Sequence, residues 1–246
     1  MSDFWSGRFN VVVLAAGLGS RLRPETEALP KALVEIGDRR AIDFSIEKYA
    51  PSAGRIVIAS GHGAELLEDH VSSRYPDLPV RYSREEMRSL SGPGMSLVKA
   101  LDHVDPALPS VVTFCDYLVE GDLPLDADAL GLCRPDDPHS VLGTYWTVAR
   151  VRVGFVTDLV VNPDPAGARE DGFTGIFVCR DTALLRSIAS DAAARGIADY
   201  TLDVVLPYVK RVPTRALRLA RLLEFGTRET LLQTRERLHG PRPVSS

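Results

Sequence analysis

Short, continuous apolar runs alternate along the first half of the chain with segments in which apolar positions recur every three or four residues. A short apolar run predicts a buried strand, whereas the wider spacing predicts an amphipathic helix. The predicted strands are 11–16, 55–60, 80–82 and 110–115, and the predicted helices are 41–49, 64–75 and 95–101. Strands that alternate with helices in this way predict an α/β fold: a doubly wound, Rossmann-like mixed sheet, mainly parallel, with helices on both faces.

The pattern changes after about residue 140. Strands predicted at 141–148 and 155–161 follow one another with only a turn between them, so we expect a small antiparallel lid. The remaining predicted elements are a strand at 173–179, helices at 181–194 and 199–208, a strand at 220–225 and a last helix that ends near residue 238. With no internal repeat and no clear linker, we expect a single domain over 1–246, to which about 140–180 contributes an acceptor-binding lobe.

Composition and charge narrow the class of protein. A chain of 246 residues can bury a sizeable core, and a net charge of −4 gives no basic surface for nucleic acid or an anionic membrane. No stretch approaches the roughly 20 apolar residues that span a bilayer, and the first residues lack the regions of a signal peptide. We therefore expect a cytoplasmic protein without nucleic-acid or membrane partners, and a homo-oligomer is compatible with this sequence. Cys115, Cys133 and Cys179 form no CxxC pair, which argues against a disulfide framework or a zinc site.

The first strand runs into a glycine-rich turn, Gly17-Leu18-Gly19-Ser20-Arg21. Glycines allow positive φ and a close backbone approach, so successive N–H groups can point at phosphate oxygens. The P-loop pattern GxxxxGK[ST] is absent, which disfavours a Walker-type NTPase. The dinucleotide pattern GxGxxG has Leu22 in place of its third glycine, which weakens the interpretation as a nicotinamide-dependent oxidoreductase.

Cations follow this turn at Arg21, Arg23 and Lys31, the last directly after Pro30. Arginine offers a planar fork to phosphate oxygens, and lysine supplies a compact, mobile charge. Each could instead be a solvated surface charge, as most charged residues are. Their position next to a strand and a glycine-rich turn favours a phosphate site.

The segment from Leu14 to Pro24, followed by Pro30-Lys31-Ala32-Leu33-Val34, resembles the signature of the nucleoside triphosphate transferase family. That family includes sugar-1-phosphate nucleotidyltransferases and phosphocholine cytidylyltransferases. The resemblance extends from about residue 11 to 238 and weakens after residue 120. It implies that Arg21 steadies the leaving pyrophosphate and that Lys31 contacts the transferred phosphoryl group and the acceptor phosphate. The nucleotide-binding residues that it implies in the first loop are Leu14, Ala15, Ala16, Gly17, Gly19, Ser20 and Arg21.

Two carboxylates are candidates for holding Mg²⁺, the cofactor that phosphate chemistry of this kind usually needs. Asp116 ends the strand at 110–115, which places it at the carboxyl edge of the sheet, although a turn former or a helix cap could stand there too. The family places its first metal aspartate at this point. Its second carboxylate precedes a short turn before the last helix, and Glu224 matches that place. Many sugar-type members have Asp there, and a Glu pointing into solvent is the alternative.

The base and the acceptor are less sharply indicated. We expect the base to lie against the first loop and the stretch 91–96, with Gly94 and Ser96 as contacts, although an ordinary Gly/Pro loop explains that stretch as well. The Glu-Lys-Pro segment of sugar-1-phosphate members is missing, which favours CTP and a small phosphorylated or phosphonate acceptor. The resemblance places Lys31, Tyr117 and Gly175 near that acceptor. A quaternary ammonium group would need an aromatic or acidic cage, for which the available rings are Tyr117, Tyr145, Trp146, Phe173 and Tyr200.

The expected activity is the Mg-dependent transfer of NMP, with CMP favoured, from an NTP to the acceptor with release of pyrophosphate. No general base is required, because the attacking phosphate oxygen is already ionised near neutral pH. Two alternatives remain: a sugar-1-phosphate nucleotidyltransferase that uses UTP, dTTP or GTP, and a catalytically degenerate nucleotide sensor.

Overall fold

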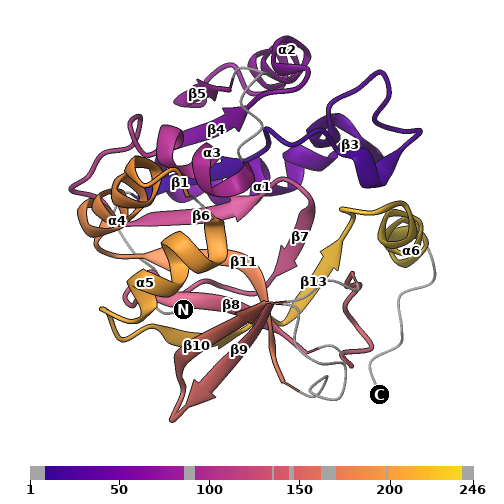
Figure 1. The fold of residues 1–246 in the computed structure, drawn as a ribbon. Coiled ribbons are helices and arrows are strands. Elements are labelled where there is room, and N and C mark those ends of the chain that lie inside the picture. The colour runs from indigo at the N-terminus through magenta and orange to yellow at the C-terminus, as the bar shows by residue number, and fades with distance from the viewer. Residues whose placement is uncertain are drawn as a thin grey trace.

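A nine-stranded sheet organises the computed structural model, which describes residues 9–85, 92–134, 136–143, 147–161, 170–197 and 199–239 (Figure 1). The strand order is β5-β4-β1-β6-β11-β8-β12-β10-β9. These strands are β1 (Phe9–Leu14), β4 (Ala53–Ser60), β5 (Val80–Arg84), β6 (Ser110–Phe114), β8 (Ala129–Cys133), β9 (Thr147–Arg152), β10 (Phe155–Val161), β11 (Gly172–Cys179) and β12 (Arg215–Arg218). The helices are α1 (Ala41–Tyr49), α2 (Ala64–Arg74), α3 (Gly92–Ala100), α4 (Thr182–Ala194), α5 (Leu206–Val209) and α6 (Arg228–His239).

The predicted Rossmann-like mixed α/β fold is confirmed, with its parallel strands concentrated in the first half of the chain. Strands β5, β4, β1 and β6 pair in parallel, as β8 and β12 do, whereas β11 runs antiparallel to β6, β8 and β9. Parallel neighbours need a crossover connection, usually a helix. Helices join the strands of the first half, but only the turn at Val153 and Gly154 joins β9 to β10, so that pair is antiparallel.

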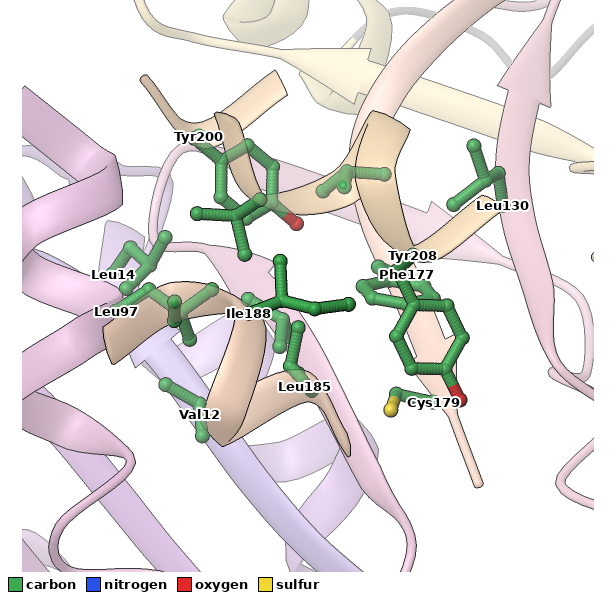
Figure 2. Packing of buried hydrophobic residues seen from close by; sticks show 14 of the residues in the cluster. Val12, Leu14, Leu97, Leu130, Phe177, Cys179, Leu185, Ile188, Tyr200 and Tyr208 are labelled. Atoms are coloured by element: carbon green, nitrogen blue, oxygen red, sulfur yellow. The ribbon is translucent and has the colours of Figure 1, made fainter. Parts of the chain in front are cut away.

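Helices cover both faces of the parallel strands, as the sequence predicts. Alternate side chains of β1 point to opposite faces. Val12 and Leu14 pack with α3, α4 and the segment that leads into α5, whereas Val11 and Val13 pack with α1 and α2. Figure 2 shows the first of these two cores, with Leu97, Leu185 and Ile188 among the labelled residues.

Two sequence predictions need correction. The strand predicted at 141–148 is wrong within the described residues, because Val141 forms only an isolated bridge to Leu223 and β9 begins at Thr147. Apolar character at Val141 reflects burial beneath Leu222 and Leu223 rather than membership of the hairpin. The helix predicted at 199–208 begins as a π-helix at Tyr200–Val205 and only its last turn, α5, is α-helical.

A small antiparallel sheet beside the main one carries the two candidate metal ligands. It pairs β7 (Tyr117–Glu120) with β13 (Arg221–Glu224), and Glu224 lies opposite Tyr117 in register. The Phe225 N–H donates to the Asp116 carbonyl oxygen at 3.0 Å, which ties the two strand ends together. Helix α6 follows β13, and Thr227 caps its start, because its Oγ1 accepts from the Thr230 N–H.

Among the described residues, no helix combines the length and the apolar character that crossing a membrane requires. All three cysteines are buried free thiols, which agrees with the expectation that they form no disulfide framework.

Candidate active site

A cavity of about 290 Å³ opens at the carboxyl ends of β1, β5 and β6. Register explains why distant segments meet there: Leu14 lies opposite Phe114 on one side and opposite Ala59 on the other. The loop after β1 and the residues after β6 therefore begin side by side. The lining residues that the sequence predicts are Leu14, Ala15, Ala16, Gly17, Arg21, Lys31, Ser96, Asp116 and Tyr117. Gly92 and Pro93, from the predicted stretch 91–96, also line the cavity, and Glu85, Phe114 and Cys115, which the sequence did not predict, complete the lining.

The loop after β1 is held by packing below it. Gly19 has φ 65°, and a Cβ there would lie 2.9 Å from Thr26 Cγ2, while Thr26 Oγ1 donates to the Gly19 carbonyl oxygen. Ser20 and Arg21 then form a single 3-10 turn, Ser20–Leu22. Leu22, in place of a third glycine, is buried with Val34 and Phe225. Leu22, where the sequence departs from the dinucleotide pattern, thus packs in the core and holds the loop in place, whereas Arg21 stays exposed.

Lys31 and Asp116 form an ion pair between Nζ and Oδ2. Lys31 opens the short 3-10 turn Lys31–Leu33, directly after Pro30, and Asp116 is 4% exposed. Burial by itself lowers the pKa of Lys31, but the charges of Asp116 and Cys115 outweigh it, and the pKa is raised above its ordinary value. Lys31 is therefore a cation throughout the physiological range.

One oxygen of the Asp116 carboxylate takes no part in the ion pair with Lys31. Its Oδ1 is buried and makes no hydrogen bond to any residue that the structure describes. A buried carboxylate oxygen without a donor is costly, so a ligand there would relieve the cost.

Glu224 faces the same point from β13. Its Oε2 accepts from the Gly143 N–H at 2.6 Å. A Cβ built on Gly226 would lie 2.5 Å from Asp116 Oδ2 and 3.0 Å from Glu224 Oε1, so the two carboxylates border the space that this glycine leaves open. Burial, then the Asp116 charge, raises the pKa of Glu224.

The residues present fit a divalent cation of the hard, oxygen-binding kind. The described part of the chain holds no group of three potential protein ligands. Mg²⁺ is usually bound through one or two carboxylates, with substrate phosphates and water as the remaining ligands. Two facing carboxylates, one with a buried oxygen that has no partner in the described part of the chain, meet that requirement.

Arg21 is near this centre although it contacts none of these groups directly. Burial raises the pKa of Tyr117 and of Glu224, and the positive charge of Arg21 offsets a small part of that rise. An exposed guanidinium beside an ion pair is free to turn toward an incoming polyanion.

A second cavity of about 260 Å³ adjoins the first, because Pro93, Phe114 and Tyr117 line both. Its other lining residues are Thr147, Val161, Phe173, Thr174, Gly175, Asp199, Tyr200 and Thr201. Gly175 has φ 84°, and a Cβ there would lie 2.5 Å from Phe114 Cε2. The Tyr200 hydroxyl donates to the Gly175 carbonyl oxygen at 2.7 Å.

The predicted residues thus divide between the two cavities and their surroundings. Tyr117 and Gly175, predicted to contact the acceptor, line the second cavity, as Phe173 and Tyr200 of the aromatic set do. Tyr145 and Trp146 lie outside the described residues. Gly19, Ser20, Gly94 and Glu224 line neither cavity. Gly94 is buried within α3, and the Ser96 hydroxyl donates to the Gly92 carbonyl oxygen at 3.3 Å.

Comparison with known proteins gives this site a family context. Residues 11–123 match the family model described as the MobA-like NTP transferase domain. This match confirms, for that part of the chain, the resemblance to nucleoside triphosphate transferases, and it includes the first loop, Lys31 and Asp116.

Particular relatives are nucleotidyltransferases of several kinds. The bifunctional protein GlmU of Ralstonia nicotianae is 29% identical over 210 residues, which are 80% of this chain and 43% of that protein. The CTP:phosphocholine cytidylyltransferase LicC of Streptococcus pneumoniae superposes with a TM-score of 0.73 at 22% identity, over 94% of this chain and 99% of the other. A UDP-glucose pyrophosphorylase from Acinetobacter baumanii gives 0.74 at 17% identity, over 96% and 95%. This chain spans less than half the length of the GlmU protein. The two solved structures share the fold of this chain.

Proposed function

We propose that this chain is a nucleotidyltransferase that moves NMP, with CMP favoured, from an NTP to the phosphate or phosphonate of a small acceptor. The observation that carries the proposal is the Lys31–Asp116 pair in a cavity that shares the wall of Phe114 and Tyr117 with a second cavity. A transfer between two substrates needs two adjoining sites with cationic and metal-binding groups where they meet.

In the proposed reaction an acceptor phosphate oxygen attacks the α-phosphorus of the NTP. A new P–O bond forms as the bond from the α-phosphorus to the bridging oxygen of the β-phosphate breaks, and pyrophosphate leaves with that electron pair. Lys31, held as a cation, faces the transferred phosphoryl group, and Arg21 is free to accompany the leaving group. The acceptor oxygen is already ionised, so no side chain has to remove a proton.

Asp116 and Glu224 would hold Mg²⁺, which when bound would neutralise charge on the phosphate oxygens. Support comes from the buried Asp116 Oδ1, which no described residue contacts through a hydrogen bond, and from the space at Gly226 that the two carboxylates border. The Gly143 N–H fixes one oxygen of Glu224, so the longer side chain is retracted against the backbone and its other oxygen turns toward Asp116.

The second cavity would take the organic part of the acceptor. Its lining includes Phe114, Phe173 and Tyr200, and also Asp199, whose Oδ1 accepts from the Thr201 and Leu202 N–H groups. Aromatic faces with a nearby carboxylate suit an alkylammonium group. A phosphorylated amino alcohol is therefore the favoured acceptor, a choice in keeping with the phosphocholine enzyme among the structural neighbours. The alternative is a sugar-1-phosphate, since GlmU and UDP-glucose pyrophosphorylase are also relatives.

A pyrophosphate-release screen tests the proposal. CTP, UTP, dTTP, ATP and GTP are each paired with phosphocholine, phosphoethanolamine, simple phosphonates and sugar-1-phosphates, and products are identified by mass spectrometry. We expect release with one acceptor class and its loss in Lys31→Ala and Asp116→Ala. Lys210→Ala, which removes an exposed lysine that pairs with Asp158, is the matched control. Unchanged activity in the first two variants would contradict the mechanism, and nucleotide binding without turnover for any pair would favour a sensor.

A further inference from the structure

Glu85 is a carboxylate in the first cavity that the proposed transfer does not use. It follows the last residue of β5 and lines the cavity with Gly92, Pro93 and Ser96. Its Oε1 is buried, and none of the described residues donates a hydrogen bond to it. The backbone of Glu85 is held in place, because its N–H donates to the Ser60 carbonyl oxygen at 2.7 Å.

Sheet topology places Glu85 and the Lys31–Asp116 pair at opposite ends of the cavity. Strands β5, β4, β1 and β6 are parallel neighbours, and their carboxyl ends share one edge. Ser60 lies opposite Arg84 in register, so Glu85 leaves the sheet at the same level as the loop after β1. Neighbouring strands lie about 4.8 Å apart, which separates the end of β5 from the end of β6 by roughly 14 Å.

A nucleotide would lie along this edge in one direction only. Its phosphates carry the negative charge and belong with Lys31 and Arg21, because opposite charges attract. The base then points toward Glu85. A base at that end meets a buried acceptor oxygen to which no described residue donates.

A carboxylate accepts hydrogen bonds and donates none. The exocyclic amine of cytosine donates two, whereas uracil and thymine carry a carbonyl oxygen at the same ring position. That oxygen would face the Glu85 carboxylate without a proton between them, and the buried carboxylate oxygen would stay without a partner.

We propose that Glu85 selects cytosine over uracil and thymine by accepting a hydrogen bond from the exocyclic amine of the base. The inference rests on the proposed function for the identity of the site as a nucleotide site. Base preference is a separate property, because nucleotide dissociation constants measure it without any turnover.

The test compares the dissociation constants of CTP and UTP by isothermal titration calorimetry, for the wild-type chain and for Glu85→Gln. Glutamine keeps the shape, offers an oxygen to the cytosine amine and offers an amide N–H to the uracil carbonyl. We expect wild type to bind CTP at least tenfold more tightly than UTP, and Glu85→Gln to reduce that ratio at least tenfold, mainly through tighter UTP binding. Glu68→Gln is the matched control, because Glu68 is a nearby carboxylate that pairs with Arg84 and does not line the cavity. It should leave the ratio unchanged.

The outcomes separate this inference from the proposed function. Equal or stronger wild-type binding of UTP relative to CTP would overturn the role of Glu85, even if pyrophosphate release shows that the chain is a transferase. An unchanged ratio in Glu85→Gln would overturn it too, as would a failure of wild type to bind either nucleotide. A preference for CTP that Glu85→Gln removes would support it, even if no acceptor in the screen supports turnover.

Discussion

Lys31 Nζ contacts Asp116 Oδ2 although 85 positions separate the two residues in the chain. The contact joins a turn that follows the first loop to the end of β6, and it occupies one carboxylate oxygen while the other stays buried without a partner among the described residues. A cation is thereby held beside a carboxylate that has one coordination position free. This arrangement is not the most stable one, since satisfying both oxygens would stabilise the fold more, and it fits the proposed phosphate chemistry.

Replacement of Lys31 should abolish most of the transfer without unfolding the protein. Lys31→Met keeps the length of the side chain and removes its charge, so the transferred phosphoryl group loses its cation. We expect kcat to fall by about 10²–10³, the usual cost of losing one preorganised charge at a reacting centre. Steady-state kinetics with the best substrate pair measures this, with circular dichroism as the check on folding. Lys210→Met should keep wild-type kcat, and a change confined to KM in Lys31→Met would contradict a role in the chemical step.

Chelation should stop the reaction reversibly. With EDTA we expect no pyrophosphate release, and added Mg²⁺ should restore it. Glu224→Gln keeps the shape and removes one charge from the pair with Asp116, so it should raise the Mg²⁺ concentration for half-maximal activity at least tenfold. Glu224→Asp retains the charge and should be milder. An Mg²⁺ titration of all three proteins gives the comparison, and identical titration curves would remove Glu224 from the metal site.

A methyl group on Gly175 should disturb the acceptor more than the nucleotide. In Gly175→Ala the new Cβ would press on the Phe114 ring, which forms part of the wall between the two cavities. We expect the KM for the acceptor to rise several-fold or more. Gly196→Ala is a sharp control, because Gly196 also has positive φ, 73°, but a Cβ there would meet nothing within 4 Å. Equal effects of the two variants would show that backbone strain, rather than the acceptor wall, is responsible.

The core on the α3 and α4 face should carry a large share of the stability. Phe177 is fully buried, and its ring meets that of Tyr208 edge-on with centroids 5.1 Å apart (Figure 2). Phe177→Ala should lower the free energy of unfolding by about 3–5 kcal/mol, the range for an aromatic side chain removed from a core. Phe155→Ala, at a ring that is 41% exposed, should cost much less. Urea unfolding of both variants measures the difference, and equal losses would contradict this placement of the core.

Local pattern was sufficient for the parallel half of the fold and for the residues at its edge. Apolar side chains lie on both faces of the strands at Val11 to Ala16 and Ser110 to Cys115. A strand needs apolar side chains on both faces only where helices cover both sides of the sheet. Once those strands are parallel neighbours, the glycine-rich loop and Asp116 must emerge at the same edge. The positions of the loop and of Asp116 at the ends of these strands therefore predicted most of the cavity lining.

Tertiary structure alone decided the relationships that depend on pairing between distant segments. The bridge between Val141 and Leu223 brings the Gly143 N–H to Glu224. The sequence around residue 143 contains no pattern that predicts this hydrogen bond to the last strand. The burial of Glu85 Oε1 depends on the order of strands in the sheet, which the sequence of a single strand does not encode. The sequence by itself thus determined most of the elements and the sheet edge where the candidate site lies, whereas the contact that fixes Glu224 and the burial of Glu85 were decided by strand order and register, because these arise only when remote segments pack together.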